Sequence, residues 1–244
     1  MKFSVDVRNK TETSVDLLFF GDIVNDKGYK WSDDDICPSD VAEVLTQNKD
    51  VKQMNIYINS GGGSVFAGNA IYNRLKAHSA HKTVYIDGLA GSIASVIALA
   101  GDEIVMPKNT YMMIHKAWTY AYGNSTDLRA AADSLDIIEK SIINTYADNA
   151  KEGITEEDII AKMEAETWLT AEDCAEMFDK VCVKGEIKAM NSISDITDLS
   201  FKNAPFNQNG KADEDKPEDE SIKNGLDLDM LENFIFAERS KMND

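Results

Sequence analysis

The chain has 244 residues, of which 43% are hydrophobic, and this excludes a protein that is disordered throughout. Lys and Arg number 25 against 43 Asp and Glu, so the formal net charge is −18. An acidic surface of this size repels phosphate backbones and anionic lipids, so we expect neither a nucleic acid nor a membrane as a partner.

The cysteines and the first residues predict a cytoplasmic protein. Cys37, Cys174 and Cys182 form no CxxC pair, which argues against both a disulfide framework and a zinc site. The opening segment, MKFSVDVRNK, lacks the apolar stretch of a secretory signal. We therefore expect a reducing cytoplasm and no bound metal.

Strands and helices alternate in the first hundred residues. In chain order we expect a strand (14–21), a short helix from Pro38, a strand (54–60), a helix (64–78), a strand (83–88) and a helix (92–101). The last four elements make two successive units of strand, glycine-rich turn and helix. Such units are typical of an α/β fold with a parallel sheet.

Shorter elements follow, with one long helix among them. Two short strands are expected at 103–106 and 111–115, and a helix over 126–149 carries an apolar face. Thr155 and Thr170 each precede an acidic residue by three positions, which predicts that a further helix begins at each.

The composition changes near residue 190. The segment NGKADEDKPEDES at 209–221 is dense in charge and almost free of apolar residues, so we predict a folded domain over 1–190 and an acidic disordered linker over 191–225. Apolar residues regain helical spacing in 226–244, which predicts a short amphipathic helix. That helix either docks onto a partner or folds back onto its own domain, and the sequence favours neither.

The second strand–helix turn holds a candidate nucleophile. Ser92 stands at the predicted start of a helix, where backbone N–H groups are free and negative charge is favoured. Small residues at 90, 91 and 94 leave room for a substrate. The glycine-rich turn at 59–64 offers a second set of N–H groups, and it lacks the Lys-Ser/Thr of a phosphate-binding loop. Taken alone, each turn is equally typical of an ordinary helix start.

Three histidines are available as a general base. His115 ends an apolar strand, YMMIH, a position that suits a cleft. His78 and His81 lie in a polar turn with HxxH spacing, but no nearby cysteine or carboxylate completes a metal site, so we expect them at the surface.

Four blocks bring these residues together: INSGGGSVFAG, DGLAGSIAS, MMIHKAW and ETWLTAED. In order and spacing they resemble the Clp protease proteolytic subunit family over about residues 14–185. The resemblance implies the Clp/crotonase-like α/β spiral of βα units, with a long handle helix at 126–149. It also implies a homo-oligomer of heptameric, possibly stacked, rings, and no cofactor or metal. Variants at Phe66, Trp118 and 166–168 resemble the phage and prophage branch that serves head maturation.

The resemblance also assigns roles to residues. Ser92 corresponds to the nucleophile and His115 to the general base, while the backbone N–H groups of Gly63 and Ile93 correspond to the oxyanion hole. The implied reaction is acyl transfer, in which Ser92 attacks a peptide carbonyl, His115 takes its proton, and water then hydrolyses the acyl-enzyme.

The third catalytic member departs from the family pattern. Glu166 occupies the position where the family has aspartate, and Glu164 competes with it on the same segment. Gly61 replaces the usual proline, and Gly91 replaces the usual alanine.

The expected function is a serine endopeptidase that acts on proteins or peptides in phage or prophage head maturation, with a capsid or scaffold protein as partner. One alternative is the proteolytic subunit of an ATP-dependent Clp protease, which works with a Clp ATPase in protein quality control. A second is a catalytically inactive scaffold or assembly protein. The same spiral also serves acyl-CoA hydratases and isomerases, but these use no Ser–His pair.

Overall fold

The computed structural model describes residues 5–185 of the chain. The acidic linker expected over 191–225 and the helix expected over 226–244 lie outside these residues. The described residues form a mixed α/β fold around an eight-stranded sheet, as the alternation of strands and helices predicts.

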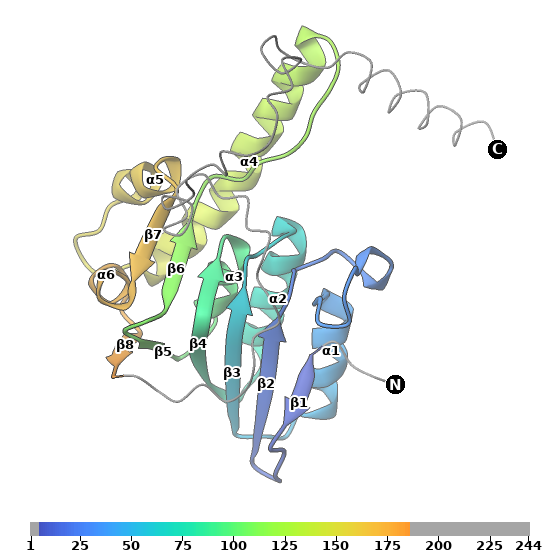
Figure 1. The fold of residues 1–244 in the computed structure, drawn as a ribbon, viewed down its shortest axis with the longest axis vertical. Helices are drawn as coiled ribbons and strands as arrows, with labels where there is room; N and C mark the ends of the chain where they lie inside the picture. The colour runs from blue at the N-terminus through green and yellow to red at the C-terminus, as the bar shows by residue number, and fades with distance from the viewer. Residues whose placement is uncertain (1–4, 186–244) are drawn as a thin grey trace, which may run out of the picture. The chain divides into compact units, whose positions relative to one another are not determined.

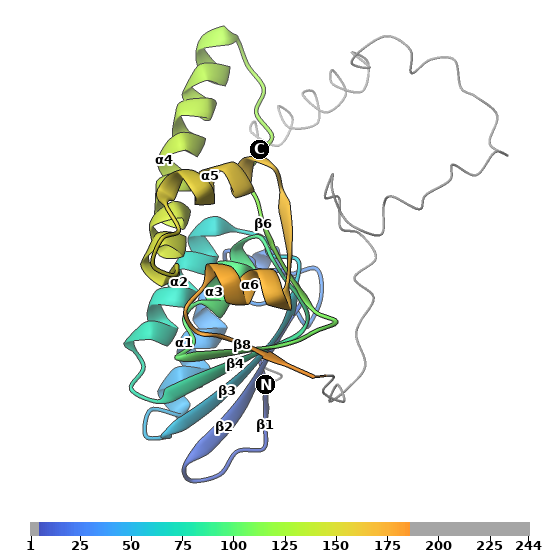
Figure 2. The same ribbon diagram turned by 90° about the vertical axis from the view of Figure 1, so that its left-hand side faces the viewer.

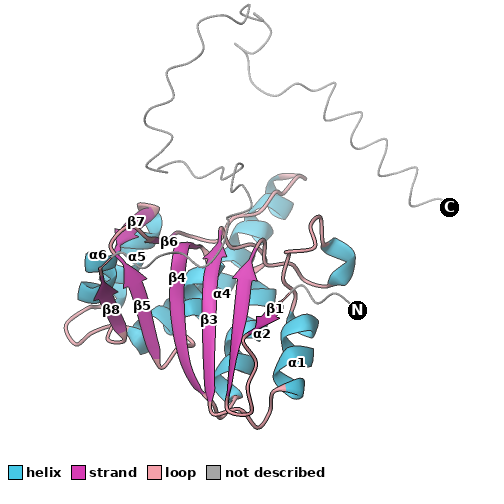
Figure 3. Ribbon diagram, turned by 60° about the horizontal axis from the view of Figure 1, so that its bottom comes forward, coloured by secondary structure: helices cyan, strands magenta, loops and turns pink. Residues whose placement is uncertain are grey.

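The sheet is largely parallel. Its strands are Asp6–Arg8 (β1), Ser14–Phe20 (β2), Gln53–Ser60 (β3), His81–Gly91 (β4), Glu103–Pro107 (β5), Tyr111–Ile114 (β6), Thr167–Thr170 (β7) and Val181–Lys184 (β8). They follow the order β1-β2-β3-β4-β5-β8, with β6 beside β4 and β7 beside β6 (Figure 1). Only β1 and β7 run antiparallel to their neighbours. Figure 3 shows β3, β4 and β5 side by side.

Helices cover the sheet and complete the core. They are Pro38–Gln47 (α1), Val65–Ala77 (α2), Ile93–Ala98 (α3), Ser125–Asn149 (α4), Glu156–Glu164 (α5) and Ala171–Met177 (α6), with a 3-10 turn at Lys27–Tyr29 (η1). Figure 2 shows α1 and α2 on the same side of the sheet. Alternate β3 residues, Met54, Ile56 and Ile58, are buried in one cluster with Ile71 and Leu75 of α2. Burial of these side chains is the main source of the fold's stability.

Strand β4 divides the sheet, and this division shapes the site. Its first half, Thr83–Tyr85, pairs with β5, while Leu89–Gly91 pairs with Tyr111–Met113 of β6. The strand therefore runs three residues past its predicted end at 88, because the glycine-rich stretch has a strand partner. The following helix, α3, ends at Ala98 and not at 101 as predicted.

The long helix confirms its predicted bounds almost to the residue. Asn124 caps its N-terminus in a reciprocal capping box, and Thr155 and Thr170 cap α5 and α6 in the same way, as their spacing predicts. Only the C-terminal half of the apolar face is covered by the described part of the chain. Tyr146 is buried there, whereas Leu128, near the other end, is 45% exposed. Figures 1 and 2 show this end of α4 reaching past the sheet.

Candidate active site

Ser92 is the single residue between a strand and a helix. Strand β4 ends at Gly91 and α3 begins at Ile93, so Ser92 makes the whole reversal, with φ 53° and ψ −126°. A positive φ is uncommon for a residue with a side chain, and it is found at sharp turns that expose a reactive group. The turn is pinned by the Ser92 N–H, which donates to the Met113 carbonyl at 2.7 Å.

The pairing of β4 with β6 brings His115 to the serine. Gly91 lies opposite Met113, so Ser92, directly after β4, and His115, directly after β6, lie at the same edge of the sheet. The Nε2 atom of His115 lies 2.8 Å from Oγ of Ser92, within hydrogen-bonding distance. The structure therefore joins two side chains that are 23 residues apart, in the arrangement of a nucleophile and its general base.

The surroundings of His115 favour a neutral imidazole. Burial lowers the pKa of His115, and the charge of Glu166 acts in the opposite direction. A neutral ring can accept the Ser92 proton at neutral pH, whereas an imidazolium cannot.

Glu166 reaches this histidine through the antiparallel pairing of β6 and β7. Ile114 pairs with Thr167, so Glu166, just before β7, is placed next to the residue that follows β6. Its backbone has φ 49°, a second strained turn beside the site. Glu164 is placed differently: its side chain is 60% exposed, and a carboxylate oxygen lies 3.8 Å from Nζ of Lys116. Of the two candidate carboxylates, the structure thus gives Glu166 the electrostatic contact with His115.

Two backbone N–H groups lie at the turns predicted to form the oxyanion hole. Ile23 fixes the first turn, because its N–H donates to the Gly62 carbonyl and its carbonyl accepts from the Ser64 N–H, both at 2.7 Å. The N–H groups of Gly63 and Ile93 donate to no acceptor within residues 5–185. Both donors therefore remain available for a ligand, as an oxyanion hole requires.

The two departures from the family pattern lie against each other. A Cβ atom on Gly91 would lie 3.0 Å from the carbonyl oxygen of Gly61, tighter than ordinary van der Waals contact. The backbones of the two turns are therefore in close contact at these glycines, and a side chain at position 91 would require the facing turn to shift.

An open groove with a volume of about 1010 Å³ runs past these groups. Four aromatic side chains line it, two from the segment around η1 and two from the chain after β6: Tyr29, Trp31, Trp118 and Tyr120. All four are more than half exposed, and the reading of the sequence missed all but Trp118. Exposed aromatic residues beside a cleft commonly bind apolar groups of a ligand.

An ion-pair cluster, also missed from the sequence, anchors the chain after His115. Nζ of Lys116 lies 3.2 Å from a carboxylate oxygen of Glu139 on α4, in addition to its contact with Glu164. The hydrogen bond to Glu139 raises the pKa of Lys116, so the lysine keeps its charge. The Glu139 side chain is only 8% exposed, so loss of the lysine would leave a nearly buried carboxylate without this cation.

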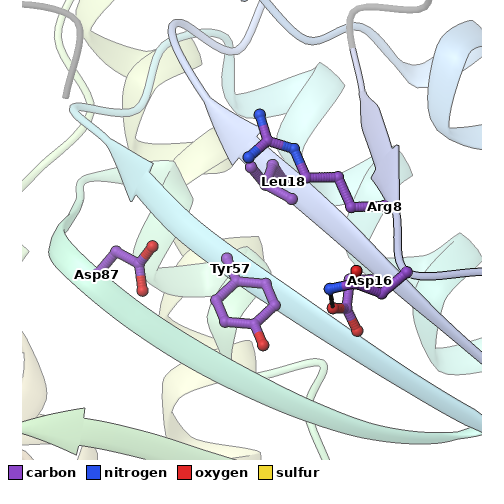
Figure 4. A pocket seen from close by; sticks show the side chains of 6 residues that line it. Arg8, Asp16, Leu18, Tyr57 and Asp87 are labelled. Atoms are coloured by element: carbon purple, nitrogen blue, oxygen red, sulfur yellow. Dashed lines mark hydrogen bonds between the residues drawn. The ribbon is translucent and has the colours of Figure 1, made fainter. Parts of the chain in front are cut away.

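A second hollow lies away from this groove, over strands β1 to β4 (Figure 4). It is lined by Arg8, Asn9, Asp16, Leu18, Tyr57 and Asp87. Burial raises the pKa of Asp87 to about 6 and that of Tyr57 to about 12. None of these lining residues is a serine, cysteine or histidine, whereas Ser92 and His115 both line the groove described above.

Residues 5–185 contain all three cysteines. The three cysteines are free thiols, and no cluster of His, Cys, Asp and Glu in this part is arranged to hold a metal ion. None of its helices combines the length and apolarity needed to cross a bilayer.

Known proteins share this sequence pattern. The family model described as Clp protease matches residues 33–184. An ATP-dependent Clp protease proteolytic subunit of Ligilactobacillus salivarius is 34% identical over 149 residues, which are 59% of this chain and 74% of that protein. One of Bacteroides fragilis is 32% identical over 138 residues, 54% of this chain and 65% of its own length. The chain thus spans a little less than two thirds of the Bacteroides relatives.

Proposed function

Because the chain belongs to the Clp protease family, we propose that it is a serine endopeptidase with Ser92 as its nucleophile and His115 as its general base. The observation that carries the proposal is the 2.8 Å distance between Ser92 Oγ and His115 Nε2. Ser92 attacks the peptide carbonyl as His115 takes its proton, and His115 then returns the proton to the departing amine. Water, activated by the same histidine, hydrolyses the acyl-enzyme.

The remaining groups stabilise the charges that develop during this reaction. The N–H groups of Gly63 and Ile93 stabilise the oxyanion of each tetrahedral intermediate, and their free state supports this role. Glu166 stabilises the imidazolium that forms when His115 accepts a proton, in keeping with the effect of its charge on the histidine pKa.

The proposal extends to the setting in which this chemistry works. One setting is head maturation in a phage or prophage, which requires cleavage of a capsid or scaffold protein. The resemblance at Phe66, Trp118 and 166–168 supports this setting. The relatives' name, ATP-dependent Clp protease proteolytic subunit, favours the alternative of a ring-shaped homo-oligomer that receives unfolded protein from a Clp ATPase. Either setting is cytoplasmic.

Cleavage of a labelled unfolded protein tests the function and separates these settings. The full chain is incubated with the substrate alone and with a Clp ATPase and ATP, beside Ser92→Ala as control. We expect cleavage by the wild-type chain only. Cleavage without the ATPase supports a self-sufficient maturation enzyme, and cleavage that needs it supports the alternative. No cleavage under either condition, with assembly intact, supports an inactive scaffold.

Glu166→Gln is expected to lower kcat/KM by roughly 10²- to 10⁴-fold, because the imidazolium loses its stabilising charge and its orienting partner. The pH dependence of kcat/KM should also shift in a defined direction. The reaction needs neutral His115, and the charge of Glu166 raises the pKa of that histidine. Removing the charge therefore moves the acidic limb of the profile to lower pH.

Glu164→Gln is the matched control for this substitution. Its side chain faces Lys116 and is largely exposed, so we expect a change of less than about threefold and no shift of the acidic limb. Equal losses of kcat/KM in the two variants, or a loss confined to Glu164→Gln, would show that Glu166 is not the third catalytic member.

A further inference from the structure

The conformation of Ser92 needs support from outside its own turn. A residue with φ 53° and ψ −126° is strained, and such a conformation persists only where several contacts impose it. The Ser92 N–H is held by Met113, as described above. The Ser92 carbonyl accepts two hydrogen bonds, from the backbone N–H of Ser95 at 3.0 Å and from the Ser95 hydroxyl at 2.6 Å.

The Ser95 hydroxyl is in turn bonded to the long helix. Its Oγ lies 2.7 Å from the Tyr146 hydroxyl on α4, and both side chains are only 1% exposed. A serine hydroxyl has one proton, and that proton goes to the Ser92 carbonyl, so Tyr146 must donate to Ser95. Burial raises the pKa of Tyr146, which keeps its proton in place. A single chain of hydrogen bonds therefore runs from Tyr146 through Ser95 to the backbone of Ser92.

If Ser95 and Tyr146 had only a structural role, their hydrogen bond would need only to satisfy two buried hydroxyl groups. Here the final acceptor is the carbonyl of Ser92, whose backbone is strained and whose hydroxyl lies within hydrogen-bonding distance of His115. Tyr146 is also fixed in the core, where its ring lies against Phe178 with centroids 6.0 Å apart. Packing of the Tyr146 ring in the core thus fixes the hydroxyl that bonds to Ser95.

We propose that Ser95 and Tyr146 are positioning residues, whose hydrogen bonds hold the Ser92 backbone in the turn that aims its hydroxyl at His115. The inference rests on the proposed function, because it gives these residues a part in activating that serine. It connects the nucleophile to α4, a helix that contributes no residue to the lining of the groove.

Three variants separate positioning from stability. Ser95→Ala removes the bond to the Ser92 carbonyl and leaves the Tyr146 hydroxyl buried without that partner, so both the rate of Ser92 modification by a fluorophosphonate and the melting temperature should fall. The rate should fall about tenfold, the upper range for one neutral hydrogen bond. The double variant Ser95→Ala/Tyr146→Phe removes the stranded hydroxyl as well. It should recover most of the melting temperature but not the rate. Tyr146→Phe alone should show a smaller loss of rate, since Ser95 still reaches Ser92.

Thr110→Val is the matched control. Thr110 is 1% exposed, and its hydroxyl donates to the Pro107 carbonyl at 2.8 Å, in a turn that contributes nothing to the groove. Its loss should lower the melting temperature and leave the rate of modification unchanged.

A wild-type rate in both Ser95→Ala and the double variant would overturn the proposal. A crystal structure of Ser95→Ala decides it independently of activity: a widened distance between Ser92 Oγ and His115 Nε2 supports positioning, and a retained distance of 2.8 Å refutes it. An unreactive wild-type protein with a widened distance in the variant would contradict the proposed function alone.

Discussion

Replacement of His115 by alanine is expected to slow the reaction of Ser92 by roughly 10⁴- to 10⁶-fold. Within residues 5–185, no other histidine lines the groove, and the Nε2 atom of His115 is 2.8 Å from the hydroxyl that must lose its proton. Without this base the serine hydroxyl is a weak nucleophile at neutral pH. The rate is measured as peptide hydrolysis and as modification by a fluorophosphonate, with circular dichroism to show that the variant is folded.

His81→Ala is the control for loss of an imidazole. The His81 side chain is 55% exposed, and its Nδ1 lies 3.9 Å from a carboxylate oxygen of Asp102, at the far end of β4 from Ser92. It should react at close to the wild-type rate. A His115→Ala protein that is folded and reacts within tenfold of wild type would remove the histidine from the mechanism.

The second large effect is expected from Gly62→Ala, which should lower kcat/KM by at least about 100-fold. A Cβ atom at Gly62 would lie 2.7 Å from both the Gly91 carbonyl oxygen and the Ser92 Cβ. The two turns would have to separate, and a displacement of about 1 Å between reacting groups costs about this factor. The backbone at Gly62 has φ +104°, so strain adds to the contact.

Gly153→Ala separates the effect of backbone strain from the effect of steric contact. Gly153 has a similar φ of +96°, but a Cβ atom there would meet nothing within 4 Å. It should lose about 1 kcal/mol of unfolding free energy to backbone strain and keep its activity. Unfolding is measured by chemical denaturation and activity by peptide hydrolysis. If both variants lost stability equally and neither lost activity, the close packing of the two turns would have no catalytic importance.

Local signals in the sequence predicted the elements that lead to the site. The apolar runs at β3 and β4, the helical spacing of α2 and the threonine caps of α5 and α6 are all properties of neighbouring residues. For this reason the bounds of α4 were predicted within one residue.

Elements that depend on distant partners were missed or misplaced. The stretch from Gly88 to Gly91 has a glycine-rich composition typical of a turn, but pairing with β6 makes it a strand. Strands β1, β7 and β8 are three or four residues long and are defined by their neighbours in the sheet, so no periodic pattern marks them.

In the candidate site, too, local signals were predicted and tertiary contacts were not. Ser92 and His115 were each found from their local setting, but only the resemblance joined them, because the β4–β6 register is a tertiary feature. The links from Lys116 to Glu139 and from Ser95 to Tyr146 join residues 23 and 51 positions apart in side-chain contacts that sequence spacing does not encode.

Mass analysis of the intact protein after treatment with a fluorophosphonate tests the central claim most directly. The reagent forms a bond between Ser92 Oγ and phosphorus as fluoride leaves and His115 takes the hydroxyl proton. We expect a single adduct on the wild-type chain, mapped to Ser92 and absent from Ser92→Ala and His115→Ala. An adduct that persists in folded Ser92→Ala, or no adduct on assembled wild-type protein, would contradict an activated serine at this position.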